Sequence, residues 1–226
     1  EGWMWYDTPR MILQIQIQYA DGSSEWINSD DSWKVSTGSI LSNGIFTGEH
    51  VDARLEKSGW NLPGFDDSSW KKAAVVRAPT GRLQAQVCPP DRVIKTLKPI
   101  NLEKIKPGVY LADIGQMISG WITLRASGKR GDEIRLRHIE ELGNDYNQID
   151  VFTLSGDGNE IFKPRFTWHA FRHVEISGIS GELTLDDITA QVVNTDVDTV
   201  GSFSCSNDLF NQIYKNYVWT QLGNLH

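Results

Sequence analysis

Alternating polar and apolar residues near the start of the chain predict a β-hairpin. Within residues 11–19, one face carries Leu13, Ile15, Ile17 and Tyr19, and three glutamines occupy the positions between them. This period of two is typical of a strand that turns one face toward a core. Asp21-Gly22 supplies the positive φ values that a tight turn needs, and Glu25-Trp26-Ile27 returns as the second strand.

Further along the chain, six short segments have the same period and are separated by turns. They are residues 109–115, 120–126, 133–138, 150–154, 173–177 and 188–193. Several short strands at this spacing indicate a β-sandwich. By contrast, residues 36–79 are rich in Gly, Ser, Asn and Asp, and we expect a long ordered loop region there, of the kind that usually carries function.

The period changes from two to that of a helix near the end of the sequence. Asn207 can cap a helix whose apolar face is formed by Leu209, Phe210, Ile213 and Tyr217. We expect this face to lack its native partner, as it would if the sequence were cut through a larger helical domain.

These elements predict an all-β chain: two jelly-roll-like β-sandwich modules in tandem, followed by a short α-helix. Pro89-Pro90 and Lys98-Pro99 interrupt any sheet between the two groups of strands and mark a boundary near residue 90. The expected domains are residues 1–90, 91–200 and 201–226, the last being the start of a further domain.

Charge and aromatic content narrow the class of ligand. A net charge of −7 leaves no broad basic face, so we expect neither nucleic acid nor a membrane as a partner. Nine Trp and six Tyr suit carbohydrate binding, because a flat ring covers the apolar face of a sugar while carboxylates and amides bind its hydroxyls. Cys88 and Cys205 fall in different expected modules, and no disulfide is predicted.

Catalytic and metal signatures are weak in this sequence, and no catalytic residue is predicted. The His138-Ile139-Glu140-Glu141 cluster has the wrong order for a zinc hydrolase, and we expect it to be structural. Asp66-Asp67 and Asp186-Asp187 are adjacent pairs, whose side chains would point to opposite faces of a strand, so neither predicts a glycosidase dyad. The oxygen-rich segment 144–150 lacks the glycine and final Glu of an EF-hand and is expected to be a solvated turn.

A sugar site is predicted in the long loop region, where acids, an amide, an arginine and aromatic rings converge. The candidate residues are Asn43, Glu49, Asp52, Arg54, Trp60 and Trp70. They could bind the hydroxyls and the apolar face of a sugar, with calcium as a bridging ion. The alternative is that Arg54 pairs with Asp52 or Glu49 only to hold the loop in shape.

Several motifs, in order, resemble bacterial α-L-rhamnosidases of glycoside hydrolase family 78. The family's N-terminal module is resembled by Gly48-Glu49, by Asp52-Ala53-Arg54 and by residues 59–70, a segment that begins with Gly-Trp and ends with Trp. Residues 113–116, 119–121, 138–142 and 164–175 resemble its second sandwich, and residues 201–207 resemble the entry into its catalytic domain.

The resemblance implies a function for the parent enzyme. Such enzymes hydrolyse terminal α-L-rhamnosides with inversion, using Glu residues of an (α/α)₆ barrel that would follow Asn207, so this chain is expected to be a non-catalytic portion. It would act as a scaffold and bind rhamnose, with calcium in the first module. The alternatives are an inert spacer or a self-contained β-sandwich hydrolase, and a periplasmic or extracellular location is expected rather than a cytoplasmic one.

Overall fold

The structure is a computed structural model that describes residues 10–45, 47–78, 80–82, 84–144 and 147–226. The chain divides into two compact units. Unit 1 comprises residues 1–37 and 58–83, and unit 2 comprises residues 38–57 and 84–226. The expected domain boundaries at residues 90 and 200 stay predictions, but segment 38–57 clearly packs with the later part of the chain.

Unit 1 contains the predicted hairpin. Strand β1 (Gln14–Gln18) pairs antiparallel with β2 (Ser24–Asn28), with Ile15 opposite Ile27, and the turn contains Gly22 at a φ of 87°. A second small pair joins β3 (Lys34–Val35) to β6 (Lys71–Lys72). The hairpin prediction is confirmed, but none of the unit 1 residues that the structure describes is buried.

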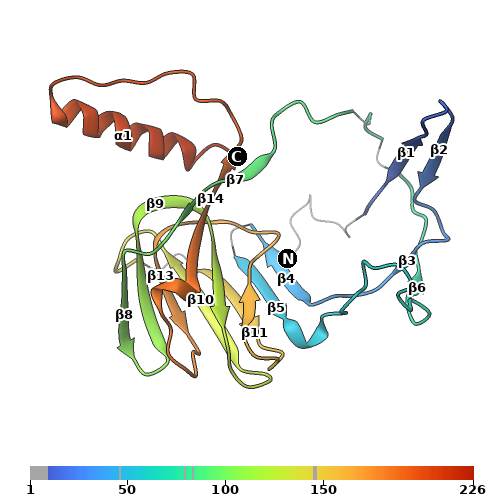
Figure 1. Ribbon diagram of the computed structural model, residues 1–226, viewed down its shortest axis with the longest axis horizontal. Coiled ribbons are helices and arrows are strands. Elements are labelled where there is room, and N and C mark those ends of the chain that lie inside the picture. Colours follow the sequence, from blue (N-terminus) through green and yellow to red (C-terminus); the bar gives the residue numbers. More distant parts are fainter. Residues whose placement is uncertain (1–9, 46, 79, 83, 145–146) are drawn as a thin grey trace. The chain divides into compact units, whose positions relative to one another are not determined.

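Unit 2 is built on one ten-stranded sheet (Figure 1). Its path runs β4-β5-β11-β10-β13-β9-β14-β7, while β8 and β12 also pair with β9. The pairing of β5 with β11 is parallel, and the other pairings are antiparallel. The strands are β4 (Ile40–Gly44), β5 (Gly48–Asp52), β7 (Asp91–Leu97), β8 (Asn101–Lys106), β9 (Val109–Ala126), β10 (Glu133–Ile139), β11 (Gln148–Thr153), β12 (Glu160–Phe162), β13 (His169–Ser177) and β14 (Ile188–Thr195).

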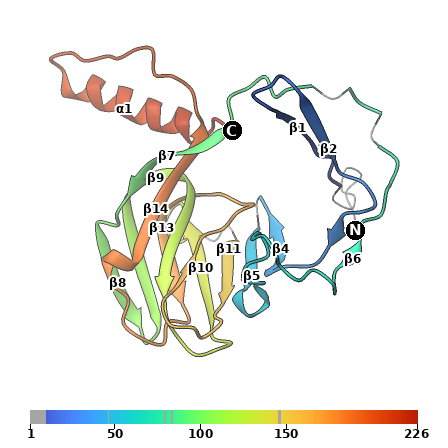
Figure 2. The same ribbon diagram turned by 45° about the vertical axis from the view of Figure 1, so that its right-hand side comes forward.

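Strand β9 joins the two strands predicted at 109–115 and 120–126 into one. Gly115 and Gly120 have φ values of 78° and 155°, so they bend the strand without ending it. A Cβ at Gly120 would lie 1.8 Å from the carbonyl oxygen of Gln191, and only glycine permits this close approach of β14. The first half of β9 pairs with β8 and β13 and the second half with β14, which lets the sheet curl around its own core (Figure 2).

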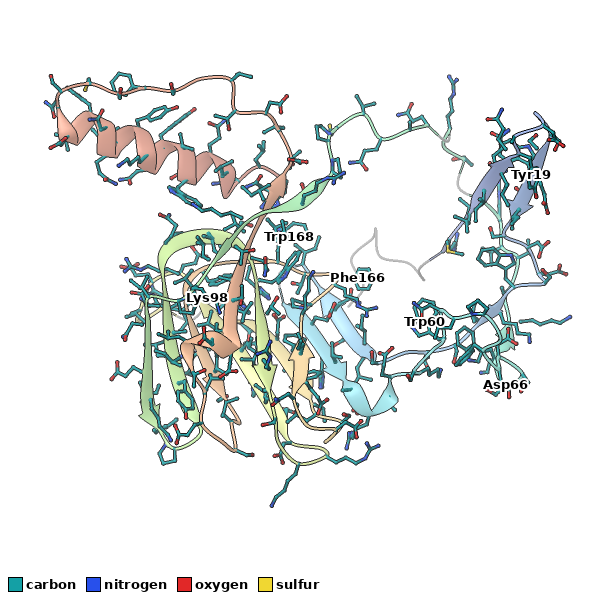
Figure 3. All side chains as sticks on the ribbon, viewed as in Figure 1. Tyr19, Trp60, Asp66, Lys98, Phe166 and Trp168 are labelled. Carbon is teal, nitrogen blue, oxygen red and sulfur yellow. The ribbon has the colours of Figure 1, made fainter. Side chains whose placement is uncertain are left out.

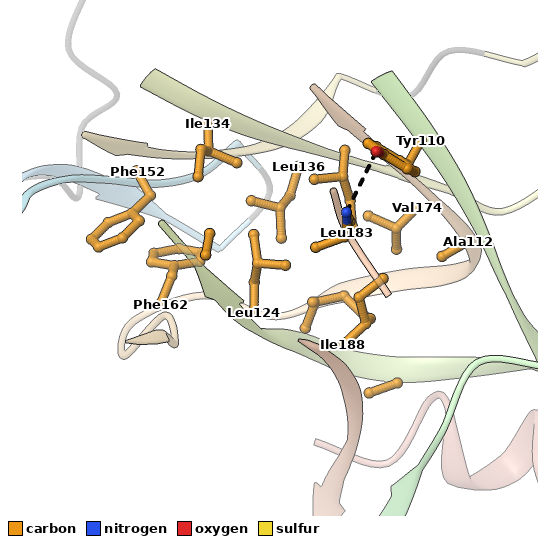
Figure 4. Packing of buried hydrophobic residues seen from close by; sticks show 14 of the residues in the cluster. Tyr110, Ala112, Leu124, Ile134, Leu136, Phe152, Phe162, Val174, Leu183 and Ile188 are labelled. Carbon is orange, nitrogen blue, oxygen red and sulfur yellow. Dashed lines mark hydrogen bonds between the residues drawn. The ribbon is translucent and has the colours of Figure 1, made fainter. Parts of the chain in front are cut away.

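The core of unit 2 consists of alternate residues from the curled strands, and it confirms the all-β class (Figure 4). Ile122, Leu124, Leu136 and Ile188 are fully buried. Tyr110 closes one end of this core, where its hydroxyl oxygen accepts a 3.4 Å hydrogen bond from the backbone N–H of Leu183. Two 3₁₀ turns, η1 (Ala53–Leu55) and η2 (Leu185–Asp187), complete the sheet connections.

The loop prediction for residues 36–79 was wrong in part, because β4 and β5 lie there as strands of the large sheet. The apolar alternation fails in β5 because its buried positions include Glu49 and Asp52. Buried acids with partners elsewhere in the fold remove the pattern by which a strand is normally identified.

Helix α1 (Asp208–Leu222) begins as predicted, with the Asn207 side chain accepting a hydrogen bond from the N–H of Leu209. Trp219 packs against the core of unit 2, and the Lys95 ammonium lies 5.5 Å from the centre of its ring. On the predicted apolar face, Leu209, Phe210, Ile213 and Tyr217 are each more than half exposed. Within the described part of the chain, no helix has the length and apolarity to cross a membrane.

Candidate functional site

Glu49 lies in β5 and is almost fully buried, with 1 % of its surface exposed. Its carboxylate accepts hydrogen bonds from two consecutive backbone N–H groups, those of Arg165 at 3.1 Å and Phe166 at 3.0 Å. Burial raises the pKa of the Glu49 carboxyl, and these two hydrogen bonds oppose the effect. Glu49 therefore holds in place the loop that precedes β13, and Phe166 is part of this loop (Figure 3).

Asp52 and Arg54 form a bidentate pair at the end of β5. Arg54 Nε lies 2.8 Å from Asp52 Oδ1, and Arg54 Nη2 lies 2.7 Å from Oδ2. The same Oδ1 also accepts the backbone N–H of Arg54 at 3.0 Å, which caps the 3₁₀ turn η1. The Arg54 hydrogen bonds lower the pKa of the Asp52 carboxyl, so the pair is ionised at neutral pH.

The six predicted sugar-site residues divide between the two units. Asn43 is exposed on β4, where it pairs in register with Glu49, and both belong to unit 2 with Asp52 and Arg54. Trp60 and Trp70 belong to unit 1. Within that unit Trp60 is 52 % exposed (Figure 3). Trp70 packs edge-on against Phe65, with ring centres 5.7 Å apart. Whether the six residues bind a sugar stays a prediction.

The two acidic pairs stabilise turns. Asp66 accepts the backbone N–H of Ser68 at 3.0 Å, and Asp67 pairs with Lys34 at 2.7 Å. Asp187 accepts both the N–H and the hydroxyl of Thr184, at 2.9 and 2.6 Å, at the start of η2. The segment 144–150, expected to be a solvated turn, lies partly outside the described residues, because residues 145 and 146 are not described.

A buried polar cluster that the sequence patterns did not reveal lies on the inner face of the large sheet. It consists of His138 on β10, Asp150 on β11 and His169 at the start of β13, each no more than 1 % exposed. His169 Nε2 lies 3.0 Å from Asp150 Oδ1, and the same oxygen accepts the backbone N–H of Glu49 at 2.9 Å. The expectation that the cluster beginning with His138 is structural took no account of Asp150 and His169, which come from other strands.

A small depression lies elsewhere on unit 2, between β8, β9, β10 and β13. It has a volume of about 210 Å³, and its wall includes the Arg137–Glu175 ion pair, which spans 3.1 Å. Small-molecule pockets are usually larger, about 300–1,000 Å³. This depression is therefore a minor surface feature compared with a typical binding site.

Comparison with known families matches both parts of the chain. Residues 2–95 match the family described as alpha-L-rhamnosidase N-terminal domain, and residues 103–194 match the bacterial alpha-L-rhamnosidase concanavalin-like domain. Together the two matches include most of the hairpin unit and nearly the whole curled sheet.

Similar individual proteins are all described as α-L-rhamnosidases. One from Streptomyces avermitilis is 36 % identical over 96 % of this chain, and one from Formosa agariphila is 34 % identical over 98 %. The chain spans only 22 % and 25 % of these two relatives.

Solved structures agree with this result. An α-L-rhamnosidase from Dictyoglumus thermophilum superposes with a TM-score of 0.93 and 44 % identity over 98 % of this chain and 26 % of its own. The Streptomyces avermitilis enzyme, solved in complex with L-rhamnose, gives a TM-score of 0.86 over 95 % of this chain and 22 % of its own. The chain belongs to the bacterial α-L-rhamnosidases of glycoside hydrolase family 78, of which it carries the N-terminal and concanavalin-like β-domains.

Proposed function

We propose that this chain is the non-catalytic β-scaffold of an enzyme that hydrolyses terminal α-L-rhamnosides. The observation that carries the proposal is the orientation of its buried acids. Glu49, Asp52 and Asp150 all bind groups of the chain itself, two of them through backbone N–H groups of distant segments. A glycosidase needs one carboxyl free to protonate the leaving oxygen and a second to activate water or attack the sugar.

Hydrolysis of p-nitrophenyl α-L-rhamnoside by the purified 226-residue chain tests this proposal. We expect no turnover above the rate in buffer. The rival, a self-contained β-sandwich hydrolase, requires turnover that rises in proportion to the chain concentration and co-elutes with the chain in size-exclusion chromatography. Such a result would overturn the scaffold proposal.

A second candidate function is rhamnose binding by unit 1, and it is favoured by an exposed ring. Trp60 presents 52 % of its surface, and an indole face of this kind can cover the apolar side of a deoxy sugar. Calcium is part of this proposal, since an ion held by carboxylates can bind two sugar hydroxyls at once.

Calorimetry with L-rhamnose, with and without calcium, tests the binding proposal. We expect binding in the millimolar range or tighter, which Trp60→Ala abolishes. Leu62→Ala is the matched control, because Leu62 is an apolar residue of the same loop and is 63 % exposed. If the parent chain shows no heat at millimolar rhamnose with calcium present, the inert-spacer alternative is favoured.

A periplasmic or extracellular location completes the proposal, since glycans that carry rhamnose are encountered outside the cytoplasm. Cell fractionation of the native host with an antibody against the chain tests it. Recovery of the protein with cytoplasmic markers would contradict it.

A further inference from the structure

The cluster of His138, Asp150 and His169 contains a fully buried carboxylate, that of Asp150. Asp150 is 0 % exposed, and its ion pairs among the described residues are with the two imidazoles alone. A carboxylate removed from water is costly unless it is paired with a cation or coordinates a metal ion. A positive charge held between these three residues would therefore stabilise the buried carboxylate.

A divalent metal ion can supply such a charge, because neutral imidazoles and a carboxylate are ligands that these ions accept.

Three atoms of the cluster are buried without a hydrogen-bond partner: His138 Nε2, Asp150 Oδ2 and His169 Nδ1. His138 Nδ1 lies 3.4 Å from the carbonyl oxygen of Gln148, which can only accept, so Nδ1 is the donor and Nε2 of the neutral imidazole has a lone pair. That lone pair faces Asp150 Oδ2 across 3.9 Å. Two acceptors directed at each other in a dry interior repel, and a cation between them would turn the repulsion into two bonds.

We propose that His138, Asp150 and His169 bind one divalent transition-metal ion of the zinc type, as a structural site inside unit 2. Two imidazole nitrogens and one carboxylate oxygen form a donor set that suits zinc and its neighbours better than calcium or magnesium, which prefer oxygen ligands alone. The site is separate from the rhamnose and calcium binding proposed for unit 1.

The geometry is close to that of a bound ion. The ligand atoms all lie within 4.8 Å of one another, whereas ligands about 2.0–2.2 Å from a tetrahedral zinc ion lie about 3.3–3.6 Å apart, so the side chains must move inward by roughly 1 Å and turn. The imidazole rings stack with centres 4.1 Å apart and an interplanar angle of 25°, and they must turn out of this stack to address one ion. Hydrogen bonds from Glu49 to Asp150 and from His138 to Gln148 already orient two ligands, as outer partners commonly do in metal sites.

Metal content and thermal unfolding of the 226-residue chain test the proposal, with Zn²⁺ and Co²⁺ as probes. We expect about one zinc per chain after loading and gel filtration. Zinc in excess should raise the melting temperature of the EDTA-treated chain by about 5–10 °C, the range for a site more than 99 % occupied in a domain of this size. His138→Gln and Asp150→Asn should lose the ion, whereas His50→Gln, which alters a histidine of β5 outside the cluster, should keep it.

Two outcomes would overturn the proposal. The first is an EDTA-treated chain whose melting temperature does not change with zinc or cobalt. The second is a bound ion that remains at full stoichiometry in both variants. If the variants fail to fold, X-ray absorption of the zinc-loaded parent chain decides, because it counts imidazole ligands: two support the site, and one or none contradicts it.

Discussion

Replacing Glu49 tests whether this carboxylate supports the fold or binds a sugar. In Glu49→Ala the backbone N–H groups of Arg165 and Phe166 lose their shared acceptor. A hydrogen bond to a charged group contributes about 1.5–3 kcal/mol. Because the two bonds to Glu49 are only partly buried, we expect the variant to lose about 2–4 kcal/mol of the free energy of unfolding. In Glu49→Gln one acceptor oxygen remains and the burial of a charge is avoided, so the loss should be about 1–2 kcal/mol.

Urea unfolding followed by circular dichroism measures these differences from the transition midpoints at constant slope. Glu103→Ala is the control, since Glu103 is exposed on β8, and such surface changes usually stay within about 0.5 kcal/mol. Our reasoning fails if Glu49→Ala unfolds like the control while rhamnose binding by the chain is lost. That result would make Glu49 a ligand-binding residue.

Three further predictions concern single positions. Arg54→Ala should lower the melting temperature without changing rhamnose affinity in calorimetry, because its guanidinium is occupied by a carboxylate within the chain; the opposite result would place it at a ligand. The hydrogen bond from Arg172 lowers the pKa of Asp113, so the stability that this ionised pair provides should be present at pH 7 and lost as the pH falls below about 3.8. Urea unfolding at a series of pH values should show that the free energy of unfolding of Asp113→Asn depends less on pH in this acidic range. Gly48→Ala should cost about 3–4 kcal/mol in urea unfolding, because its Cβ would meet the backbone of β11, whereas Gly22→Ala, in open space, should cost only about 1–2 kcal/mol; equal effects would contradict this.

Local patterns were sufficient for the hairpin and the helix. The β1–β2 turn depends on Asp21-Gly22 and the start of α1 on Asn207, and each is a device of a few neighbouring residues. Five strands of the curled sheet, β9, β10, β11, β13 and β14, were identified for the same reason, although the bend in β9 at Gly115 and Gly120 looked like a turn between two strands.

The sequence patterns failed where polar residues are buried against distant partners. Strand β5 carries Glu49, whose partners Arg165 and Phe166 lie 116 and 117 residues away. The cluster of His138, Asp150 and His169 comes from three different strands, and no short motif contains it. The one available signal was the set of polar residues at positions where the strand period calls for apolar ones.

The parallel pairing of β5 with β11 has a consequence for how the chain folds during synthesis. Glu49 leaves the ribosome 101 residues before Asp150, to which its backbone N–H is bonded in the finished sheet. At about 5–20 residues per second, this interval lasts about 5–20 s. During that time β5 has no partner strand along the edge that later pairs with β11. The Glu49 carboxylate also lacks the backbone N–H groups of Arg165 and Phe166, which are synthesised later. A charged side chain on an edge strand disfavours pairing with other strands, so we expect Glu49 to limit wrong pairing of β5 until β11 is available.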